Sequence, residues 1–152
     1  MSSRLPETSA RDVPENLAIL LREPFRAMSD EVYERLAARG HGEVRAAHGT
    51  VFQYLDDEGT RVVELARRAQ MTKQSMAALV EHLEARGYVE RITDPADGRA
   101  KLVRATARGR EVFAIVRDLV AEIDARLVER LGAAKLAQLR TLLQELDEGL
   151  KR

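Results

Sequence analysis

Apolar side chains recur at steps of three and four residues along most of the chain, which predicts a mainly helical protein. The first predicted helix covers residues 15–40, where Pro24 removes one backbone donor and Gly40 marks the end. A second helix is expected from Glu43 to Asp57. The N-terminal part of the chain thus predicts two helices separated by a break that contains glycine.

Residues 106–152 carry the longest apolar stripes. Thr106 is expected to cap a helix that runs to about Leu131, because its hydroxyl can pair with an open backbone amide. After Gly132, a last helix places leucines at alternating steps of three and four residues: Leu136, Leu139, Leu143, Leu146 and Leu150. This seam is too narrow for the interior of a monomer and suits another helix, as core or as a dimer seam.

The pattern changes in the middle of the chain, within residues 43–105. A short helix over residues 63–69 is followed after a tight turn by a second over residues 72–86, which Thr72 is placed to cap. The first helix needs a small residue where the two cross, and Ala66 supplies it. The spacing therefore predicts a helix-turn-helix.

A β-hairpin is expected directly after this helix pair. Gly87 can take the left-handed conformation that ends many helices. Residues 88–93 and 101–105 then resemble two strands, joined by a turn rich in Asp, Pro and Gly. The predicted fold class is mainly α with a small β-hairpin wing, that is, a winged helix-turn-helix domain between N- and C-terminal helices.

The second helix of the pair presents a polar first turn. In the major groove of DNA, Gln can bond an adenine edge, Ser can donate or accept, and an Ala methyl can contact a thymine methyl. A helix N-terminus attracts phosphate, and a basic hairpin tip can enter the neighbouring minor groove. We therefore assign DNA contacts to Thr72, Lys73, Gln74, Ser75, Ala78 and His82 on the helix, and to Arg99 and Lys101 on the hairpin. The alternative is an ordinary capped surface helix beside solvated turn charges.

The charge distribution favours the DNA interpretation. The net charge is zero, yet residues 61–110 carry 11 basic and 6 acidic side chains, whereas residues 1–60 carry 7 basic and 11 acidic ones. The excess of positive charge therefore lies on the segment that holds the predicted helix pair and hairpin. Phosphate binding needs such a local basic surface and not a basic whole protein.

The amino-acid composition narrows the classes of protein that remain possible. The chain has 152 residues, 45% of them hydrophobic and none of them cysteine, which predicts one domain without disulfides or thiol-based redox sensing. We expect a flexible arm at residues 1–14, no signal peptide, no membrane span and a cytoplasmic location. No Gly-rich phosphate loop, nucleophile elbow or paired His and carboxylate motif occurs, so we expect no enzyme, no cofactor and no metal site.

Taken in order, these residues resemble the MarR family of winged-helix transcription regulators. The resemblance covers roughly residues 15–150 and is carried by four segments: Glu64-Leu65-Ala66, Leu83 to Val89, Asp94-Pro95-Ala96-Asp97-Gly98-Arg99, and Thr106-Ala107-Arg108-Gly109. Two positions depart from the pattern. Ala105 stands where the family usually has leucine, and Gln70 stands where helix-turn-helix proteins often have glycine.

The resemblance implies more than the spacing does. Family members are dimers whose N- and C-terminal helices interlock, which implies dimerisation through residues 15–40 and 106–152. They bind pseudo-palindromic double-stranded operators, most often as repressors. Many release DNA when a small, often aromatic or anionic, ligand enters a cleft beside the DNA-binding lobe. By position, the residues implied for such a cleft are Arg22, Arg26, His41, His48 and Phe52.

One other class stays open at this point. A helical, dimeric interaction or adaptor protein would use the same long helices, with the hairpin as decoration and no specific DNA binding. The two hypotheses differ in whether any duplex is bound with steep salt dependence.

Overall fold

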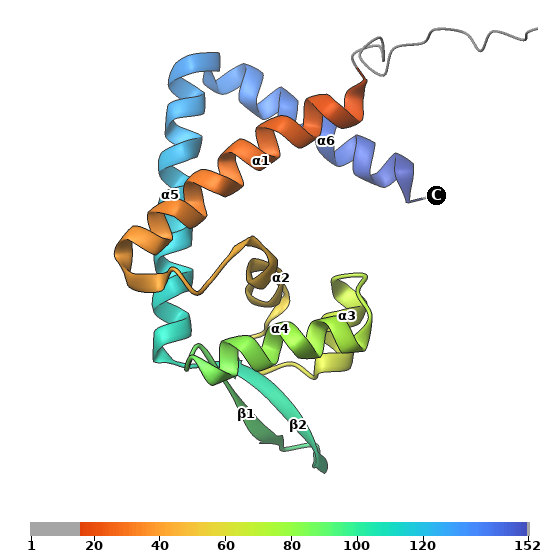
Figure 1. The fold of residues 1–152 in the computed structure, drawn as a ribbon. Helices are drawn as coiled ribbons and strands as arrows, with labels where there is room; N and C mark the ends of the chain where they lie inside the picture. Colours follow the sequence, from red (N-terminus) through yellow and green to blue (C-terminus); the bar gives the residue numbers. More distant parts are fainter. Residues whose placement is uncertain (1–15, 152) are drawn as a thin grey trace, which may run out of the picture.

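The computed structural model describes residues 16–151, and the predicted arm at residues 1–14 lies outside them. The elements, in chain order, are α1 (Leu17–Leu36), a wider π-type turn η1 (Ala37–His41), α2 (Ala46–Tyr54), α3 (Val62–Arg68), α4 (Lys73–Ala85), β1 (Val89–Asp94), β2 (Asp97–Ala105), α5 (Ala107–Leu131) and α6 (Ala133–Leu150). The predicted class, mainly helical with one β-hairpin, is confirmed (Figure 1).

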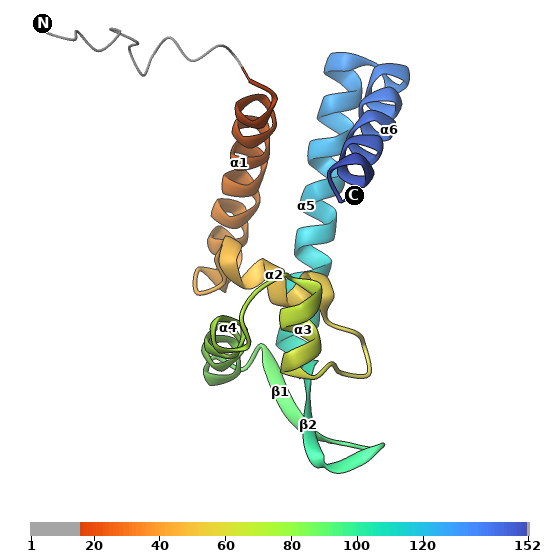
Figure 2. The ribbon, with the colours of Figure 1, turned by 90° about the vertical axis from the view of Figure 1, so that its right-hand side faces the viewer.

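The elements form two connected parts. Helices α2, α3 and α4 and the hairpin gather at one end, whereas the N-terminal stretch of α1, the far half of α5 and α6 lie toward the other (Figures 1 and 2). Helix α5 starts next to the hairpin and runs to the opposite end, where α6 folds back beside it. One long helix therefore links the two parts.

Two apolar clusters hold these parts together. The larger one fills the helix-turn-helix part, and its fully buried members include Leu65, Met76, Val80, Leu83 and Val103. A smaller one joins α1 to α5 through Val32, Leu119 and Ile123. Helices α1 and α5 contribute side chains to both clusters. Burial of apolar surface therefore stabilises the packing of α1 against α5 as well as the packing within each part.

The turn between α3 and α4 uses an unusual backbone conformation. Ala66 is buried at the crossing, as predicted, and its carbonyl accepts from the amide of Met71 at 2.9 Å. Gln70 has φ of +53°, the only positive φ on a non-glycine side chain among residues 16–151. A non-glycine residue in the left-handed conformation costs roughly 1–2 kcal/mol. The turn therefore forms with Gln70 in place of the usual glycine, at that cost in stability.

Both ends of α4 form as the sequence predicts. The hydroxyl of Thr72 accepts from the amide of Ser75 at 3.1 Å, which caps the first turn. Gly87 has φ of +77°, and the amides of Gly87 and Tyr88 donate to the carbonyls of Glu84 and Leu83. These two bonds form a Schellman motif, which ends the helix and starts the hairpin.

The hairpin differs from its prediction in the position of the turn. The turn residues are Pro95 and Ala96, and the second strand already begins at Asp97 rather than at Lys101. Thr93 pairs with Lys101 but Asp94 pairs with Asp97, so the three residues 98–100 bulge out of the register. The turn therefore lies closer to the N-terminus than predicted, because residues 98–100 form a β-bulge in the second strand and are not part of the turn.

Helix boundaries differ modestly from the predicted ones. Asn16 caps α1 through its side chain, Pro24 lies within α1, and the helix gives way to η1 before Gly40, whose φ is +94°. Helix α2 covers only Ala46–Tyr54 instead of residues 43–57. It begins late because the side chain of His48 bonds the backbone of Arg45 and so sets the first turn there.

The start of α5 is locked to the hairpin. Thr106 caps it by accepting from the amide of Gly109, and its hydroxyl donates to the carbonyl of Gly87 at 2.5 Å. A Cβ on Gly109 would lie 2.1 Å from the carbonyl oxygen of Tyr88, so only glycine fits. No helix in the described part of the chain is long and apolar enough to cross a bilayer.

Candidate DNA-binding site

The first turn of α4 is an exposed polar surface of the helix-turn-helix. Thr72, Lys73, Gln74, Ser75 and Ala78 are all exposed, as their assignment to DNA requires. Met76, Val80 and Leu83 point the other way and are fully buried. This division leaves the polar tip of the helix open to a groove while its apolar face anchors it.

The orientation of His82 differs from that of the other assigned residues. Its Nε2 lies 2.8 Å from the carbonyl of Glu43, to which it donates, and its ring stacks on His48 at 4.0 Å with an interplanar angle of 13°. The ring is thus occupied in joining α4 to α2. Sequence reasoning placed His82 on the exposed face because it could not see the loop that covers that side of the helix.

The cations near this surface fall into two groups. Most arginines of the helix-turn-helix part are held by carboxylates: Arg61 by Asp94, Arg67 and Arg68 by Glu64, Arg91 by Glu84, and Arg104 by Glu90. Lys73, Arg99 and Lys101 make no ion pair within residues 16–151, and Lys101 only donates to the hydroxyl of Thr93 at 3.0 Å. The three assigned cations are therefore among those left to meet phosphates.

Arg99 lies in the bulge next to the hairpin tip, with its backbone fixed and its side chain exposed. Its amide donates to Asp97 Oδ1 at 3.1 Å. Both α4 and the hairpin project from the same end of the molecule (Figure 1). The end that carries the polar helix tip thus also carries the free arginine.

An arginine that sequence reasoning missed holds the base of the wing. The Nε and Nη2 of Arg61 donate to Asp94 Oδ2 at 2.9 and 2.5 Å, and Asp94 is buried. The amide of Ala96 and then Arg61 lower the pKa of Asp94 below its usual value. The signal was available: Arg61 occupies the N-cap of α3 without capping it, so its side chain was free for another partner.

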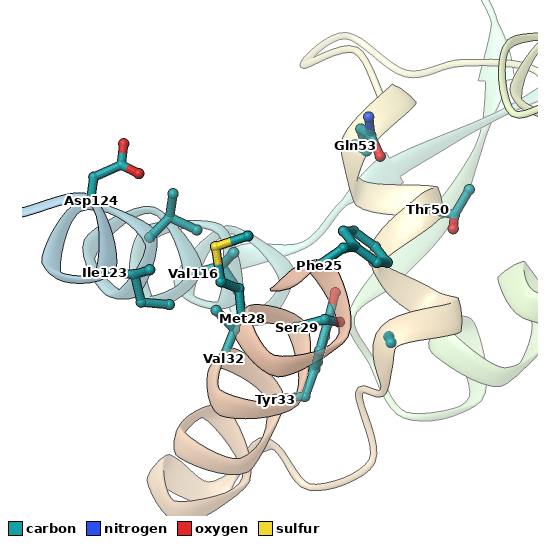
Figure 3. A pocket seen from close by; sticks show the side chains of 13 residues that line it. Phe25, Met28, Ser29, Val32, Tyr33, Thr50, Gln53, Val116, Ile123 and Asp124 are labelled. Carbon is teal, nitrogen blue, oxygen red and sulfur yellow. The ribbon is translucent and has the colours of Figure 1, made fainter. Parts of the chain in front are cut away.

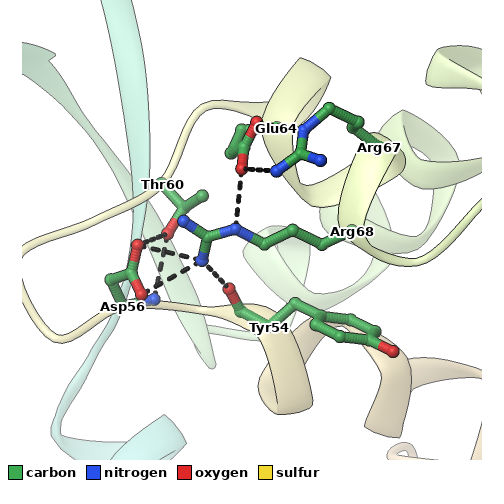
Figure 4. Close-up of polar contacts among 6 residues, drawn as sticks. All are labelled: Tyr54, Asp56, Thr60, Glu64, Arg67 and Arg68. Carbon is green, nitrogen blue, oxygen red and sulfur yellow. Dashed lines mark hydrogen bonds and ion pairs between the residues drawn. The ribbon is translucent and has the colours of Figure 1, made fainter. Parts of the chain in front are cut away.

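A second ion-pair network fixes α3 to the loop before it (Figure 4). Arg68 donates to Glu64 at 2.8 Å, to Asp56 and to the carbonyl of Tyr54 at 2.9 Å. Bonds from Arg67 and then Arg68 lower the pKa of Glu64 to about 2. The carboxylate stays charged throughout the physiological range, so the first helix of the pair keeps one position.

The five residues implied for an effector cleft do not line one cavity. His41 is buried, with Nδ1 3.0 Å from the hydroxyl of Tyr88, and His48 is engaged with Arg45 and His82. Arg22 and Arg26 are exposed on α1 and pair with neighbouring carboxylates. Phe52 packs in the core against Phe113. Within one chain these residues do not form a single site, because position along the chain does not show which face of α1 and α2 points inward.

A cavity does lie where helices α1, α2 and α5 meet (Figure 3). We call it the α1–α2–α5 cavity; its volume is about 460 Å³. The residues that line it are Phe25, Met28, Ser29, Val32, Tyr33, Ala46, Gly49, Thr50, Gln53, Val116, Val120, Ile123 and Asp124. Ala46, Gly49, Thr50 and Gln53 recur at helical spacing along α2, and this stripe of small and polar side chains was the signal that sequence reasoning missed.

Histidines and carboxylates form no metal-type cluster in the part of the chain that the structure describes. Among residues 16–151, no three His, Cys, Asp or Glu side chains come together as ligands.

Comparison with known families agrees with this geometry. The model of the MarR family matches residues 44–100, the segment from the start of α2 into the bulge of the wing. Over residues 44–100 the chain is similar to the MarR family.

The curated proteins that this chain matches are regulators by name. HTH-type transcriptional repressor Rv2887 of Mycobacterium tuberculosis is 34% identical over 88 residues. The match covers 58% of this chain and 63% of that protein, so the chain spans less than two thirds of the relative that it resembles.

Solved structures extend the likeness beyond the matched segment. The MepR–DNA complex from S. aureus has a TM-score of 0.71 at 18% identity, covering 88% of this chain and 98% of MepR, which is a likeness of fold. CouR from Rhodococcus jostii RHA1, solved with p-coumaroyl-CoA, has a TM-score of 0.63 at 26% identity and covers 87% and 92% of the two chains. Helices α1, α5 and α6 therefore belong to the same MarR-type fold as the helix-turn-helix.

Proposed function

We propose that this chain is a MarR-family, sequence-specific double-stranded DNA-binding transcriptional regulator that acts as a homodimer and represses its target genes. The observation that carries the proposal is the exposed polar tip of α4 beside three cations, Lys73, Arg99 and Lys101, that no carboxylate neutralises within residues 16–151. In this proposal Gln74 and Ser75 contact base edges in the major groove, while Arg99 enters the minor groove. A chromosomal target places the protein in the cytoplasm.

An unburied apolar surface supports the homodimer. Large apolar side chains stand exposed on α1 and α6: Leu17, Leu20, Leu21, Phe25, Leu139, Leu142, Leu143 and Leu150. Such an exposed apolar surface, spread over α1 and α6, is characteristic of a protein–protein interface and is rare on a monomer. A second copy would cover it and would bring two α4 helices to one duplex.

An effector role for the α1–α2–α5 cavity is the third part of the proposal. Helix α2 lines the cavity with one face and contacts α4 with the other through the stacked rings of His48 and His82. A ligand between α1, α5 and α2 would therefore move α4 by way of α2 and release DNA. CouR, which was solved with p-coumaroyl-CoA, shows that a protein of this fold takes a small ligand.

Substitutions at the tip and the wing test the DNA contacts. Gln74→Ala is expected to weaken binding to the selected duplex by about 1–3 kcal/mol, the worth of one good base contact. Arg99→Ala should weaken it too and lower the slope of log affinity against log salt by about 0.9, because one fewer counterion is released. Fluorescence anisotropy against salt measures both quantities.

The matched control is Arg117→Ala, an exposed arginine of α5 that pairs with its neighbour Asp118. It should leave affinity and salt slope unchanged. Unaltered affinity in both Gln74→Ala and Arg99→Ala would contradict the assignment. A stable dimer that binds no duplex with salt dependence would instead support the adaptor hypothesis.

A further inference from the structure

The α1–α2–α5 cavity has an unusual charge balance for a ligand site. Eight of its lining residues are apolar or glycine, and Ser29, Tyr33, Thr50 and Gln53 are polar but uncharged. Asp124 is the only charged residue among those that line it, and no Lys, Arg or His does. A ligand that enters this space therefore finds no cationic side chain among the described residues that line it.

The single carboxylate does not change this conclusion. Asp124 Oδ2 is paired with the Nη2 of Arg140 from α6 at 2.7 Å, so the guanidinium of Arg140 is already neutralised. Both side chains are about half exposed. An anion placed in the cavity would face the carboxylate of Asp124 and would have to displace it to reach Arg140.

The polar uncharged side chains are able to serve a neutral ligand. Tyr33 is half-buried, and burial raises the pKa of its hydroxyl, which keeps the group protonated and able to donate. A Cβ on Gly49 would lie 1.9 Å from that hydroxyl, so glycine at this position makes room for the tyrosine. Thr50 and Gln53 add a hydroxyl and an amide from the adjoining face of α2.

The physical cost of a buried anion decides between ligand classes. Burying an ionised group without a partner costs far more than burying a neutral hydrogen-bonding group. The cavity volume of about 460 Å³ suits a molecule of several rings. We infer that the α1–α2–α5 cavity selects uncharged, largely apolar ring compounds and rejects carboxylates and sulfonates, which narrows the effector class of the proposed function on which this inference rests.

Two dyes of one skeleton test the inference directly. N-phenyl-1-naphthylamine is neutral, and 8-anilino-1-naphthalenesulfonate adds one sulfonate to the same rings. Their fluorescence rises on transfer into apolar surroundings, and the chain has no tryptophan to interfere. The neutral dye is expected to bind the full chain at least tenfold more tightly than the anionic dye.

Cavity-specific binding is isolated with Ser29→Phe, which fills the cavity from α1. The dye binding that is lost in this variant is the binding to the cavity. We expect the neutral dye to show such binding, and we expect the affinity of the sulfonate for the cavity to be at least tenfold weaker. The inference would be overturned if Ser29→Phe still bound the neutral dye as well as the unmodified protein does. It would also be overturned if the neutral dye did not bind at all, for example because a second copy of the chain fills the cavity. A cavity component equal for both dyes would also overturn it.

Adding a cation provides a gain-of-function test. Thr50→Lys should tighten cavity binding of the sulfonate at least tenfold, whereas Thr50→Met, with a similar unbranched stem, should keep the preference for the neutral dye. Gln53→Lys and Gln53→Met form the second pair, to be used if circular dichroism shows that the first pair does not fold. A folded lysine variant that gains no sulfonate binding would contradict the charge argument.

These measurements contain no DNA, so they separate the inference from the proposed function. If the neutral dye binds with the expected selectivity but leaves a duplex bound, the selectivity stands and the effector role falls. If no duplex is ever bound, the dye preference remains a property of the cavity.

Discussion

At the scale of the residue, His48 joins two helices of the DNA-binding part. Its Nδ1 accepts from the amide of Arg45 at 3.0 Å, and its ring stacks on His82 from α4. A protonated Nδ1 cannot accept, so the neutral ring is the form that sets the start of α2. Burial lowers the pKa of His48 below 6.5, and the neighbouring His82, Arg86 and Arg45 lower it further.

This arrangement predicts a pH-dependent stability. Between the unfolded value of about 6.5 and the lower folded value, the unfolded chain binds more protons than the native one. The contribution is therefore complete above about pH 6.5 and is lost as the pH falls, with a slope of at most about 1.4 kcal/mol per pH unit from this residue. Urea unfolding between pH 5 and 7.5 measures the slope.

His48→Gln provides the control for this prediction. A glutamine at the third position of a helix can still accept from the cap amide but does not titrate. The variant should show a flatter stability profile over this range. Equal slopes in the two proteins would show that His48 is not the group responsible.

At the scale of the element, the start of α5 depends on a contact between backbones. The amide and hydroxyl of Thr106 bond the carbonyls of Tyr88 and Gly87, and Gly109 packs directly against Tyr88. This junction sets the angle at which the hairpin leaves the long helix. It accounts physically for the Thr-x-x-Gly spacing that the sequence contains.

Two glycine substitutions should therefore have opposite signs. Gly109→Ala is expected to lower the free energy of unfolding by about 2 kcal/mol, because its Cβ would overlap the carbonyl of Tyr88. Gly149→Ala, in α6 with nothing within 4 Å of the added Cβ, should raise it by about 0.5 kcal/mol. Thermal or urea unfolding of both variants checks the pair, and the same sign in both would refute the argument.

Local sequence patterns predicted the helices and strands well, but they predicted contacts between distant segments of the chain poorly. Apolar spacing and caps fixed α4 and α5 to within about a residue, because those signals are local. The hairpin turn was misplaced because the bulge depends on Asp94, which Arg61 holds from outside the hairpin. The five residues implied for an effector cleft lie apart within one chain for a similar reason: the cavity forms between α1, α2 and α5, and no single segment shows which faces meet.

At the scale of the whole molecule, one end carries the groups that we propose contact a DNA groove, and the other carries uncovered apolar helices. Leu139 and Leu143 are 43% and 39% exposed on α6, whereas Leu136 on the same helix is buried. The seam predicted from the leucine spacing is therefore only partly used within one chain. The remainder is available to a second copy.

Charge placed on this seam should separate the dimer. Leu139→Glu and Leu143→Glu are each expected to shift the protein toward monomer in light scattering after gel filtration, because a carboxylate would be buried at the interface. Thr141→Glu adds the same charge on the opposite side of α6 and should remain dimeric. A monomeric wild-type protein, or dimers in all three variants, would contradict the interface.

Selection of bound fragments from a random pool of DNA duplexes, followed by footprinting, tests the central claim most directly. Two α4 helices related by a twofold axis should enrich an inverted repeat whose half-sites lie about 10 base pairs apart, centre to centre. The same pool should yield no enriched sequence with Gln74→Ala and Arg99→Ala combined. Failure to enrich any duplex, or protection of one asymmetric site, would contradict the account.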